Sequence, residues 1–524
     1  MRISTLRSFW NGAAAGCAFV IVALIARAVE TVPTLPELVQ DRLVLAMPGP
    51  LFSLMLDRFL YLGKPLLFAS LMLGQVLLGA LAGVVIGRWG RPVLVAAALW
   101  LLTGFLVLPL ANRGDFAGST SVAVVTLLGY AAYAVTFVLL CGGARSRAAW
   151  FGSPRRANET GTPVLSRAII QRRELLAGGA LALVTVVLAR RAIGRLPSLP
   201  PRGSTSASGD TSVSGGAAEE TGALSTASGQ TPGLPPAVTP PARFYDVSKN
   251  LLDPTLDGGK WSVRIEGMVA QPQTLTLADL EAMAPVTEYR TLECVSNEIG
   301  GDLISNGQWT GVHLADLLQR VGVQAGATEV RFVCADNYTA NITLQQALDP
   351  TTLLAYKLDG APLPDKHGYP ARVLGVNTYG MKNPKWVTHI QLVSNAPPGF
   401  WQQQGWDEQG IVQTMSEIIT PNDGAKVAPG ATTVSGIAFA GGRGINRVEV
   451  STDGGASWSE ARLLPALGPY TWVFWQFTWQ AQPGKYTLAV RATDGTGAVQ
   501  PARRTDPFPA GATGYHEVQV RVNG

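Results

Sequence analysis

The chain has 524 residues, of which only 15% are charged, a mean hydropathy of +0.19 and a formal net charge of +5. Soluble domains contain about 25% charged residues, so these values argue against a purely soluble protein, a disordered protein and a basic nucleic-acid binder. Residues 1–200 contain 19 Lys and Arg against 7 Asp and Glu, and the rest of the chain contains 22 against 29. An apolar half that is also the basic half is typical of membrane helices with arginine-rich ends.

Five segments are predicted to span a membrane, which requires about 20 mostly apolar residues. They are residues 12–29, 65–87, 92–110, 121–141 and the shorter 175–189. Residues 43–60 are apolar but interrupted by prolines and charges, and we interpret them as interfacial or re-entrant. The arginine-rich loop between the fourth and fifth segments is predicted to be cytoplasmic, which places the chain after about residue 196 outside the cytoplasm.

The membrane segments contain few groups that carry chemistry. Arg172 and Arg173 precede the fifth segment and resemble a twin-arginine export signal, although such a pair can also simply anchor a helix. The first histidine is His313, so these spans cannot hold a haem between two histidines. With few ionisable residues in the spans, transport has little support. We interpret residues 1–195 as an anchor or a docking site for a membrane partner.

The remaining chain divides into a linker and two domains. Residues 196–242 are rich in Pro, Ser, Gly, Thr and Ala and are predicted to form a disordered tether. Residues 243–398 mix strand patterns (261–269, 288–294, 329–336) with helix patterns (277–284, 313–323), which predicts an α+β domain. Residues 399–524 show short alternating strands separated by Asp-Gly-Gly and Pro-Gly turns, which predicts an all-β sandwich.

Cys294 is the first candidate for chemistry in the outer domains. It ends a predicted strand and opens a glycine-containing loop, where a thiolate can approach a ligand closely. A buried inert cysteine and a disulfide with Cys334 are the alternatives. The sequence has no CxxC motif and no Cys/His cluster, so zinc and iron–sulfur sites have little support.

Two segments resemble the molybdopterin-binding segments of the sulfite oxidase family. One is TLECVSN around Cys294, followed by Gly301, Trp309 and Gly311, and the other is LDGAPLPDKHGYPARVLGVNTYGMKNPKW at 358–386. TPNDGAKV, VEVSTDGGASW and VRATDG resemble the immunoglobulin-like dimerisation domain of that family. The resemblance covers about residues 244–524 in order, and the membrane front resembles membrane-anchored bacterial members. It implies a helical membrane bundle, an α+β molybdopterin domain and an immunoglobulin-like β-sandwich.

The resemblance implies a cofactor of one molybdenum and one molybdopterin, with no haem in this chain. Cys294 would bind molybdenum as a thiolate, a soft ligand that suits this metal. The other implied cofactor contacts are His367 and Arg372 to the pterin phosphate or ring, Lys385 with the backbone around Asn383 and Pro384 to the phosphate, and Asp336 to pterin nitrogens.

The resemblance is weakest around the substrate. Sulfite-oxidising members carry an arginine in the segment matching residues 244–248, where this chain has Asp246, and basic residues where Glu298 and Ile299 stand. Trp406 aligns with their active-site tyrosine, and Tyr338 is a phenol that either faces the pocket or packs on the sheet. A pocket that has lost cations and gained acids, Asp246 and Glu298, should bind a dianion poorly, so we do not expect sulfite to be the substrate.

These features predict a membrane-anchored, extracytoplasmic molybdenum oxidoreductase. It would transfer an oxygen atom to or from a small oxyanion or oxo compound and exchange two electrons with a separate cytochrome or quinone-linked protein. The dimerisation-domain resemblance implies a homodimer, and nothing implies nucleic-acid binding. The alternatives are a non-catalytic sensor or scaffold with a degenerate molybdopterin-type domain, and a transporter with an outer domain.

Overall fold

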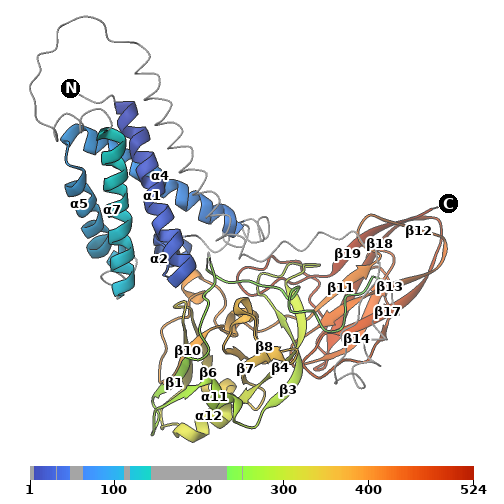
Figure 1. The fold of residues 1–524 in the computed structure, drawn as a ribbon. Helices are drawn as coiled ribbons and strands as arrows, with labels where there is room; N and C mark the ends of the chain where they lie inside the picture. The colour runs from blue at the N-terminus through green and yellow to red at the C-terminus, as the bar shows by residue number, and fades with distance from the viewer. Residues whose placement is uncertain are drawn as a thin grey trace, which may run out of the picture. The chain divides into compact units, whose positions relative to one another are not determined.

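The computed structural model describes residues 5–30, 32–45, 47, 63–110, 119–142, 233–250 and 252–523. The chain divides into two compact units, one helical and N-terminal and the other β-rich and C-terminal. We describe each unit by itself (Figure 1).

The N-terminal unit consists of helices. Their bounds are α1 (Thr5–Glu30), α2 (Leu35–Leu45), α4 (Gly63–Trp89), α5 (Pro92–Leu102), η1 (Thr103–Val107), α6 (Leu108–Leu110) and α7 (Thr120–Gly142). Four stretches are long and apolar enough to cross a membrane: Thr5–Val29, Leu67–Trp89, Pro92–Leu110 and Thr120–Cys141. These correspond to the first four predicted segments. The fifth, at 175–189, and most of residues 43–60 lie outside the described residues.

Glycines allow close packing of α1 against α4. A Cβ atom on Gly12 would lie 2.5 Å from the carbonyl oxygen of Gly79, so no larger residue fits there without a shift. The Tyr133 hydroxyl of α7 donates a hydrogen bond to that same carbonyl at 2.7 Å. Small residues at helix contacts are common in membrane bundles, and many leucines on these helices are exposed, as expected for helices in lipid.

The first half of the C-terminal unit contains two sheets. One has the order β2-β1-β10-β5-β6 and the other β3-β4-β7-β8, with β9 paired to β7. The first consists of β1 (Ser262–Gly267), β2 (Gln273–Thr276), β5 (Glu329–Cys334), β6 (Thr339–Thr343) and β10 (Val387–Val393). The second consists of β3 (Val286–Glu293), β4 (Ile304–His313), β7 (Leu353–Leu358), β8 (Ala361–Pro362) and β9 (Arg372–Leu374).

Short helices connect these strands: α11 (Leu277–Glu281), α12 (Leu314–Val321) and α13 (Leu344–Leu348). Thr276 caps α11 by accepting a hydrogen bond from the Asp279 amide, and Thr343 caps α13 in the same way through Gln346. This reciprocal capping satisfies amides that a helix start leaves unpaired. The predicted strands at 261–269, 288–294 and 329–336 and helices at 277–284 and 313–323 are confirmed as β1, β3, β5, α11 and α12.

Residues 237–249 form an irregular segment with a turn at 240–244, and we call this segment the strap. Thr239 donates its backbone N–H to the Asn306 carbonyl at 2.7 Å, and the Asn306 side chain donates to the Ala237 carbonyl at 2.7 Å. The Tyr245 amide donates to the Ser305 hydroxyl at 3.0 Å. The end of the segment predicted as linker, 196–242, is therefore hydrogen-bonded along β4 where the structure describes it.

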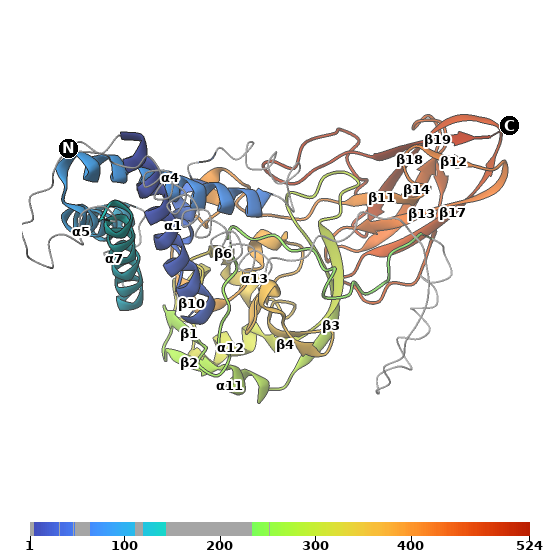
Figure 2. The same ribbon diagram turned by 45° about the horizontal axis from the view of Figure 1, so that its top comes forward.

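The second half of the C-terminal unit consists of two further sheets, with the orders β11-β13-β17-β16 and β12-β19-β18-β14-β15. The strand axes of one sheet are roughly aligned with those of the other (Figures 1 and 2). Their bounds are β11 (Met415–Thr420), β12 (Ala425–Val427), β13 (Gly430–Phe439), β14 (Ile445–Ser451), β15 (Ser459–Glu460), β16 (Arg462–Leu463), β17 (Val473–Ala481), β18 (Gly484–Asp494) and β19 (His516–Val522).

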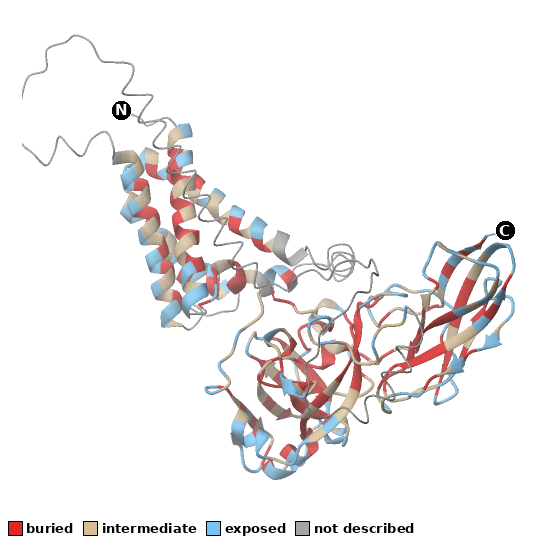
Figure 3. Cartoon of the chain, turned by 45° about the vertical axis from the view of Figure 1, so that its right-hand side comes forward, coloured by how far each residue is buried: buried red, intermediate tan, exposed pale blue. Residues whose placement is uncertain are grey.

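The two sheets share one apolar core. Val434 and Trp475 from the first sheet pack with Val448, Leu488 and Val520 from the second (Figure 3), and buried and exposed residues alternate along β19. This alternation is the pattern that predicted an all-β region.

The sandwich also contacts β3. Thr291 donates its N–H to the Tyr470 carbonyl at 3.0 Å, and the Trp472 amide donates to the Thr291 hydroxyl at 2.8 Å. The strand that leads to Cys294 is thereby supported by both halves of the unit.

Candidate active site

One pocket of the C-terminal unit gathers the eight residues that the sequence predicted as catalytic or cofactor-binding. Its empty space, counted together with its open mouth, is about 810 Å³. The predicted residues that line it are Cys294, Asp336, Tyr338, His367, Arg372, Asn383, Lys385 and Trp406. Their positions in the chain span residues 294–406, so the pocket is assembled by the fold rather than by one motif.

Cys294 lies directly after β3 and is buried with 7% exposure. Its amide donates to the Leu303 carbonyl at 2.9 Å, and its carbonyl accepts from the Asn297 amide at 3.0 Å. The Asn297 side chain closes the same loop by donating to the Glu293 carboxyl and accepting from the Leu303 amide, both at 3.0 Å. Cys294 and Cys334 do not form a disulfide with each other in the structure, which contradicts the disulfide alternative.

Glu293, the last residue of β3 and the neighbour of Cys294 in the chain, is 5% exposed. Burial raises the pKa of Glu293 to about 7, and the hydrogen bond from Asn297 lowers it only in part. One oxygen of this carboxyl is buried without a hydrogen-bond partner in the described part of the chain. The backbone of the cysteine loop is therefore rigid, but the acid beneath it is poorly solvated.

Arg372 begins β9 and is buried against the face of Trp309, with 5.3 Å from the guanidinium to the ring centre. It donates to the carbonyls of His367 at 3.3 Å and Asn383 at 3.0 Å. Burial lowers its pKa to about 10, so it remains a cation at neutral pH. Its Nε atom is buried and has no acceptor among the described residues.

His367 ends a short 3₁₀ turn, η3 (Asp365–His367), and is buried. Its Nε2 atom lies 3.0 Å from the carbonyl oxygen of Pro241 in the strap, so Nε2 carries the proton. Burial lowers the pKa of His367 to about 3, and the ring is neutral at physiological pH. Gly368 follows with φ +109°, and a Cβ there would lie 3.0 Å from the Cβ of Lys385. Only glycine suits this turn.

Lys385 and Asp246 form a largely buried ion pair at 2.8 Å between Nζ and Oδ1. Lys385 also donates to the Lys366 carbonyl at 2.7 Å and lies 4.7 Å from the centre of the Trp386 ring. Asp246 therefore neutralises Lys385, and it is not among the residues that line the pocket. Sequence reasoning treated Asp246 as an acid facing the substrate, and the structure instead pairs it with a cation.

Asn383 organises the loop before Lys385. Its side-chain oxygen accepts from the Gly375 amide at 2.5 Å, and its side-chain nitrogen donates to the carbonyls of Thr378 at 3.2 Å and Tyr379 at 2.9 Å. Its amide group is thus engaged by the loop, and only its backbone carbonyl reaches Arg372. The structure places this residue in a positioning role.

Asp336 and Tyr338 lie in the turn between β5 and β6. The Asp336 carboxyl accepts from the Tyr338 amide at 3.0 Å, and the Tyr338 hydroxyl donates to the Met381 carbonyl at 2.5 Å. Burial raises the pKa of Tyr338 well above its usual value. Tyr338 lines the pocket as a neutral phenol held by the backbone of the 381 loop.

Trp406 follows the short turn η5 (Gln402–Gln404) and packs edge-to-face on Phe508, with ring centres 5.2 Å apart. Its indole Nε1 is buried without an acceptor in the residues the structure describes. Glu298 is exposed and does not line the pocket, so its negative charge does not act at the substrate position as sequence reasoning assumed.

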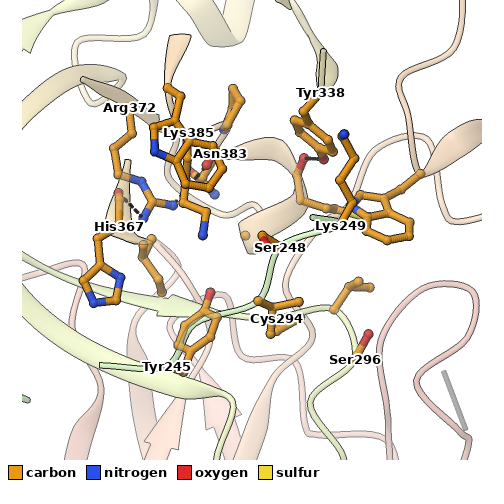
Figure 4. A pocket seen from close by; sticks show the side chains of 18 of the residues that line it. Tyr245, Ser248, Lys249, Cys294, Ser296, Tyr338, His367, Arg372, Asn383 and Lys385 are labelled. Atoms are coloured by element: carbon orange, nitrogen blue, oxygen red, sulfur yellow. Dashed lines mark hydrogen bonds between the residues drawn. The ribbon is translucent and has the colours of Figure 1, made fainter. Parts of the chain in front are cut away.

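Lys249 is a lining residue that sequence reasoning missed. Its side chain is 1% exposed, and Nζ donates to the Asp336 carbonyl at 2.8 Å. A single lysine in the strap looks like any surface lysine in the sequence, and only the path of the strap buries it. Figure 4 shows Lys249 and Tyr338 on one side of Cys294, and His367, Arg372 and Lys385 on the other.

Comparison with known families assigns this pocket. Residues 250–401 match the oxidoreductase molybdopterin binding domain, and residues 409–523 match the Mo-co oxidoreductase dimerisation domain. Sulfite oxidase from Arabidopsis thaliana is 30% identical over 349 residues, which cover 54% of this chain and 88% of that protein. The chain belongs to the sulfite oxidase family. It is a molybdopterin-dependent oxidoreductase, as the sequence resemblance predicted.

Two further relatives show the extent of the likeness. Mitochondrial sulfite oxidase from Drosophila melanogaster is 31% identical over 341 residues, covering 54% of this chain but 59% of that protein. The sulfane dehydrogenase SoxCD from Paracoccus pantotrophus superposes with a TM-score of 0.51 at 21% identity, over 63% of this chain and 96% of that one. The structural likeness shows the fold, and the sequence likeness shows the family.

The polar groups of the pocket fit the cofactor of the sulfite oxidase family. The buried Nε of Arg372 lacks an acceptor among the described residues, and an anionic phosphate supplies one, since guanidinium groups bind phosphate with directed N–H donors. Lys385 lies at the same side of the pocket, with its ammonium paired to Asp246. Cys294 would supply the thiolate that a soft metal prefers.

Proposed function

We propose that this chain is a membrane-anchored, extracytoplasmic enzyme that transfers an oxygen atom between water and a small substrate. In the oxidising direction the substrate gains one oxygen atom from water, and two protons and two electrons are released. The electrons pass to a separate carrier, a cytochrome or a quinone-linked protein. The reducing direction is the reverse. When bound, the molybdopterin cofactor supplies the oxygen-transfer and electron chemistry.

The observation that carries the proposal is that Cys294, Arg372 and Lys385 line the same pocket. Cys294 would hold the metal, and Arg372 and Lys385 would hold the phosphate of the cofactor. His367, neutral and hydrogen-bonded to the strap, would contact the pterin without adding charge. Asp336 would accept hydrogen bonds from pterin nitrogens, and its carboxyl already orients the turn that carries Tyr338.

Aromatic side chains form the remaining wall. Trp401, Trp406 and Tyr338 line the pocket and would shield the substrate from bulk solvent, which strengthens electrostatic interactions with it. Neither the Trp406 indole nor the Tyr338 phenol is charged at neutral pH. We propose that they orient the substrate rather than transfer protons.

Three finer points belong to the same proposal. The four apolar helices would anchor the enzyme. The arginines of the loop between residues 142 and 175 would keep that loop in the cytoplasm. The twin-arginine route is one way in which the domains after it would be exported. The β-rich C-terminal region would be an immunoglobulin-like module. The match of residues 409–523 to a dimerisation domain supports a homodimer.

A substrate panel on purified full-length protein tests the proposal. Sulfite, sulfoxides, N-oxides and nitrate are offered with a dye as electron donor or acceptor, and molybdenum and pterin are measured per polypeptide. We expect stoichiometric molybdenum and turnover of at least one compound, and a loss of about a hundredfold or more in C294S because the soft metal ligand is replaced by a hard one. The matched control is C334S, which alters a buried cysteine that does not line the pocket. Full activity in C294S, or protein without molybdenum and pterin, contradicts the proposal.

A further inference from the structure

Lys249 is an almost fully buried cation at the active-site pocket. Its ammonium donates to the Asp336 carbonyl at 2.8 Å, lies 3.9 Å from the Asp336 carboxyl and lies 5.1 Å from the centre of the Phe400 ring. Burial of an ammonium costs free energy even when it is paired. The strap nevertheless brings this one lysine into the pocket, which suggests that its charge is used there.

The position of Lys249 separates it from the cofactor-phosphate side. Arg372, His367 and Lys385 lie on one side of Cys294, whereas Lys249 and Tyr338 lie on the other (Figure 4). With the cofactor phosphate on the first side and the Asp336 carboxyl assigned to the pterin, the Lys249 ammonium is left for the substrate. Lys249 is the only Lys or Arg that lines the pocket on that side among the described residues.

A second, independent feature points to an oxygen-bearing ligand. Trp406 lines the same pocket, is 4% exposed, and its indole N–H has no acceptor among the described residues. A buried donor without an acceptor is costly, and a ligand oxygen would satisfy it. Trp401, which also lines the pocket, adds an apolar surface next to these donors.

We propose that Lys249 and Trp406 bind the oxygen of the substrate, and that they select compounds with a single anionic or strongly dipolar oxygen group attached to an apolar substituent. This proposal rests on the proposed function. Lys249 and Asp336 together have no net charge, so a dianion would leave two uncompensated charges in a largely buried site, whereas a monoanion leaves one and a dipolar oxygen group leaves none. The apolar substituent would pack on Trp401.

Two inert anions test the selectivity. Methanesulfonate has one charge and one methyl group, and sulfate has two charges and no apolar part. Binding of each to molybdenum-loaded full-length protein is measured by isothermal titration calorimetry, and molybdenum and pterin are measured in every sample. Wild-type protein should bind methanesulfonate at least about tenfold more tightly than sulfate.

The variants are K249M, which keeps the length of the side chain without its charge, and W406F, which removes the indole donor. A charge-assisted hydrogen bond is stronger than a neutral one, so K249M should weaken methanesulfonate binding about tenfold or more and W406F by a smaller factor. The matched control is K382M. Lys382 is another buried lysine, bonded to the Asn341 carbonyl at 3.1 Å and absent from the pocket lining. Its variant should bind methanesulfonate as the wild type does.

Three outcomes contradict the proposal. Unchanged methanesulfonate binding by loaded K249M, or tighter binding of sulfate than of methanesulfonate, overturns the Lys249 assignment alone. Loss of pterin from K249M shows that Lys249 holds the cofactor instead. Wild-type protein without molybdenum and pterin overturns the proposed function and this proposal with it, so the two failures are distinguishable.

Discussion

The two sides of the pocket are built from different kinds of segment. His367, Arg372 and Lys385 come from one continuous stretch whose loops hydrogen-bond to each other, through the carbonyls of His367 and Asn383. On the other side, Lys249 comes from the strap and Tyr338 from the β5–β6 turn. Hydrogen bonds within one stretch thus shape much of the cofactor side, and the strap supports it at His367 and Lys385. The substrate side is fixed by tertiary assembly alone.

A substitution at Arg372 is expected to have the largest effect of all, because it should weaken cofactor binding and leave substrate binding unchanged. R372K keeps the positive charge but removes the planar guanidinium. In the wild type that group donates to two carbonyls and still has its Nε–H available for a phosphate. We expect molybdenum and pterin content to fall about tenfold, while the molecules that keep the cofactor bind methanesulfonate like the wild type. The cofactor content and the calorimetric affinity of the loaded fraction check this. An R372K protein with full cofactor but weakened methanesulfonate binding would break the comparison.

The sequence predicted the cofactor side better than the substrate side for a physical reason. The stretch 358–386 contains its own turn residues, such as Gly368 with its positive φ, and its contacts are mostly local, so the motif determines the geometry. Lys249 and the Asp246–Lys385 pair depend on where the strap crosses the domain, which no local pattern specifies. Asp246 and Glu298 were consequently misread as acids of the substrate pocket.

A change in the Cys294 loop, which lies between the two sides, should weaken cofactor binding and substrate binding equally. N297A removes two buried hydrogen bonds that close the Cys294 loop, which costs about 1–3 kcal/mol when a buried group loses its partner. The melting temperature and the cofactor content should both fall, with no preference for either anion. Thermal melts with cofactor analysis check this. A stable N297A protein with altered anion selectivity would show that the loop belongs to the substrate side.

The smallest effect is expected from the protonation of His367. Burial lowers its pKa from 6.5 to about 3, so the unfolded chain binds a proton in this interval that the folded protein excludes. The stabilisation is complete above about pH 6.5 and is lost as the pH falls towards 3. As the pH falls between these values, the melting temperature of the wild type should decrease more steeply than that of H367Q. Parallel melts from pH 8 to pH 4 measure the difference, and identical slopes would contradict the buried, neutral assignment.

The central claim is that Cys294 is the protein ligand of the metal. X-ray absorption spectroscopy at the molybdenum edge counts sulfur ligands directly on loaded protein, with C334S as the control. We predict three sulfur ligands in the wild type and in C334S, two from the pterin and one from Cys294, and two in C294S. The same sulfur count in the wild type and C294S would contradict the account.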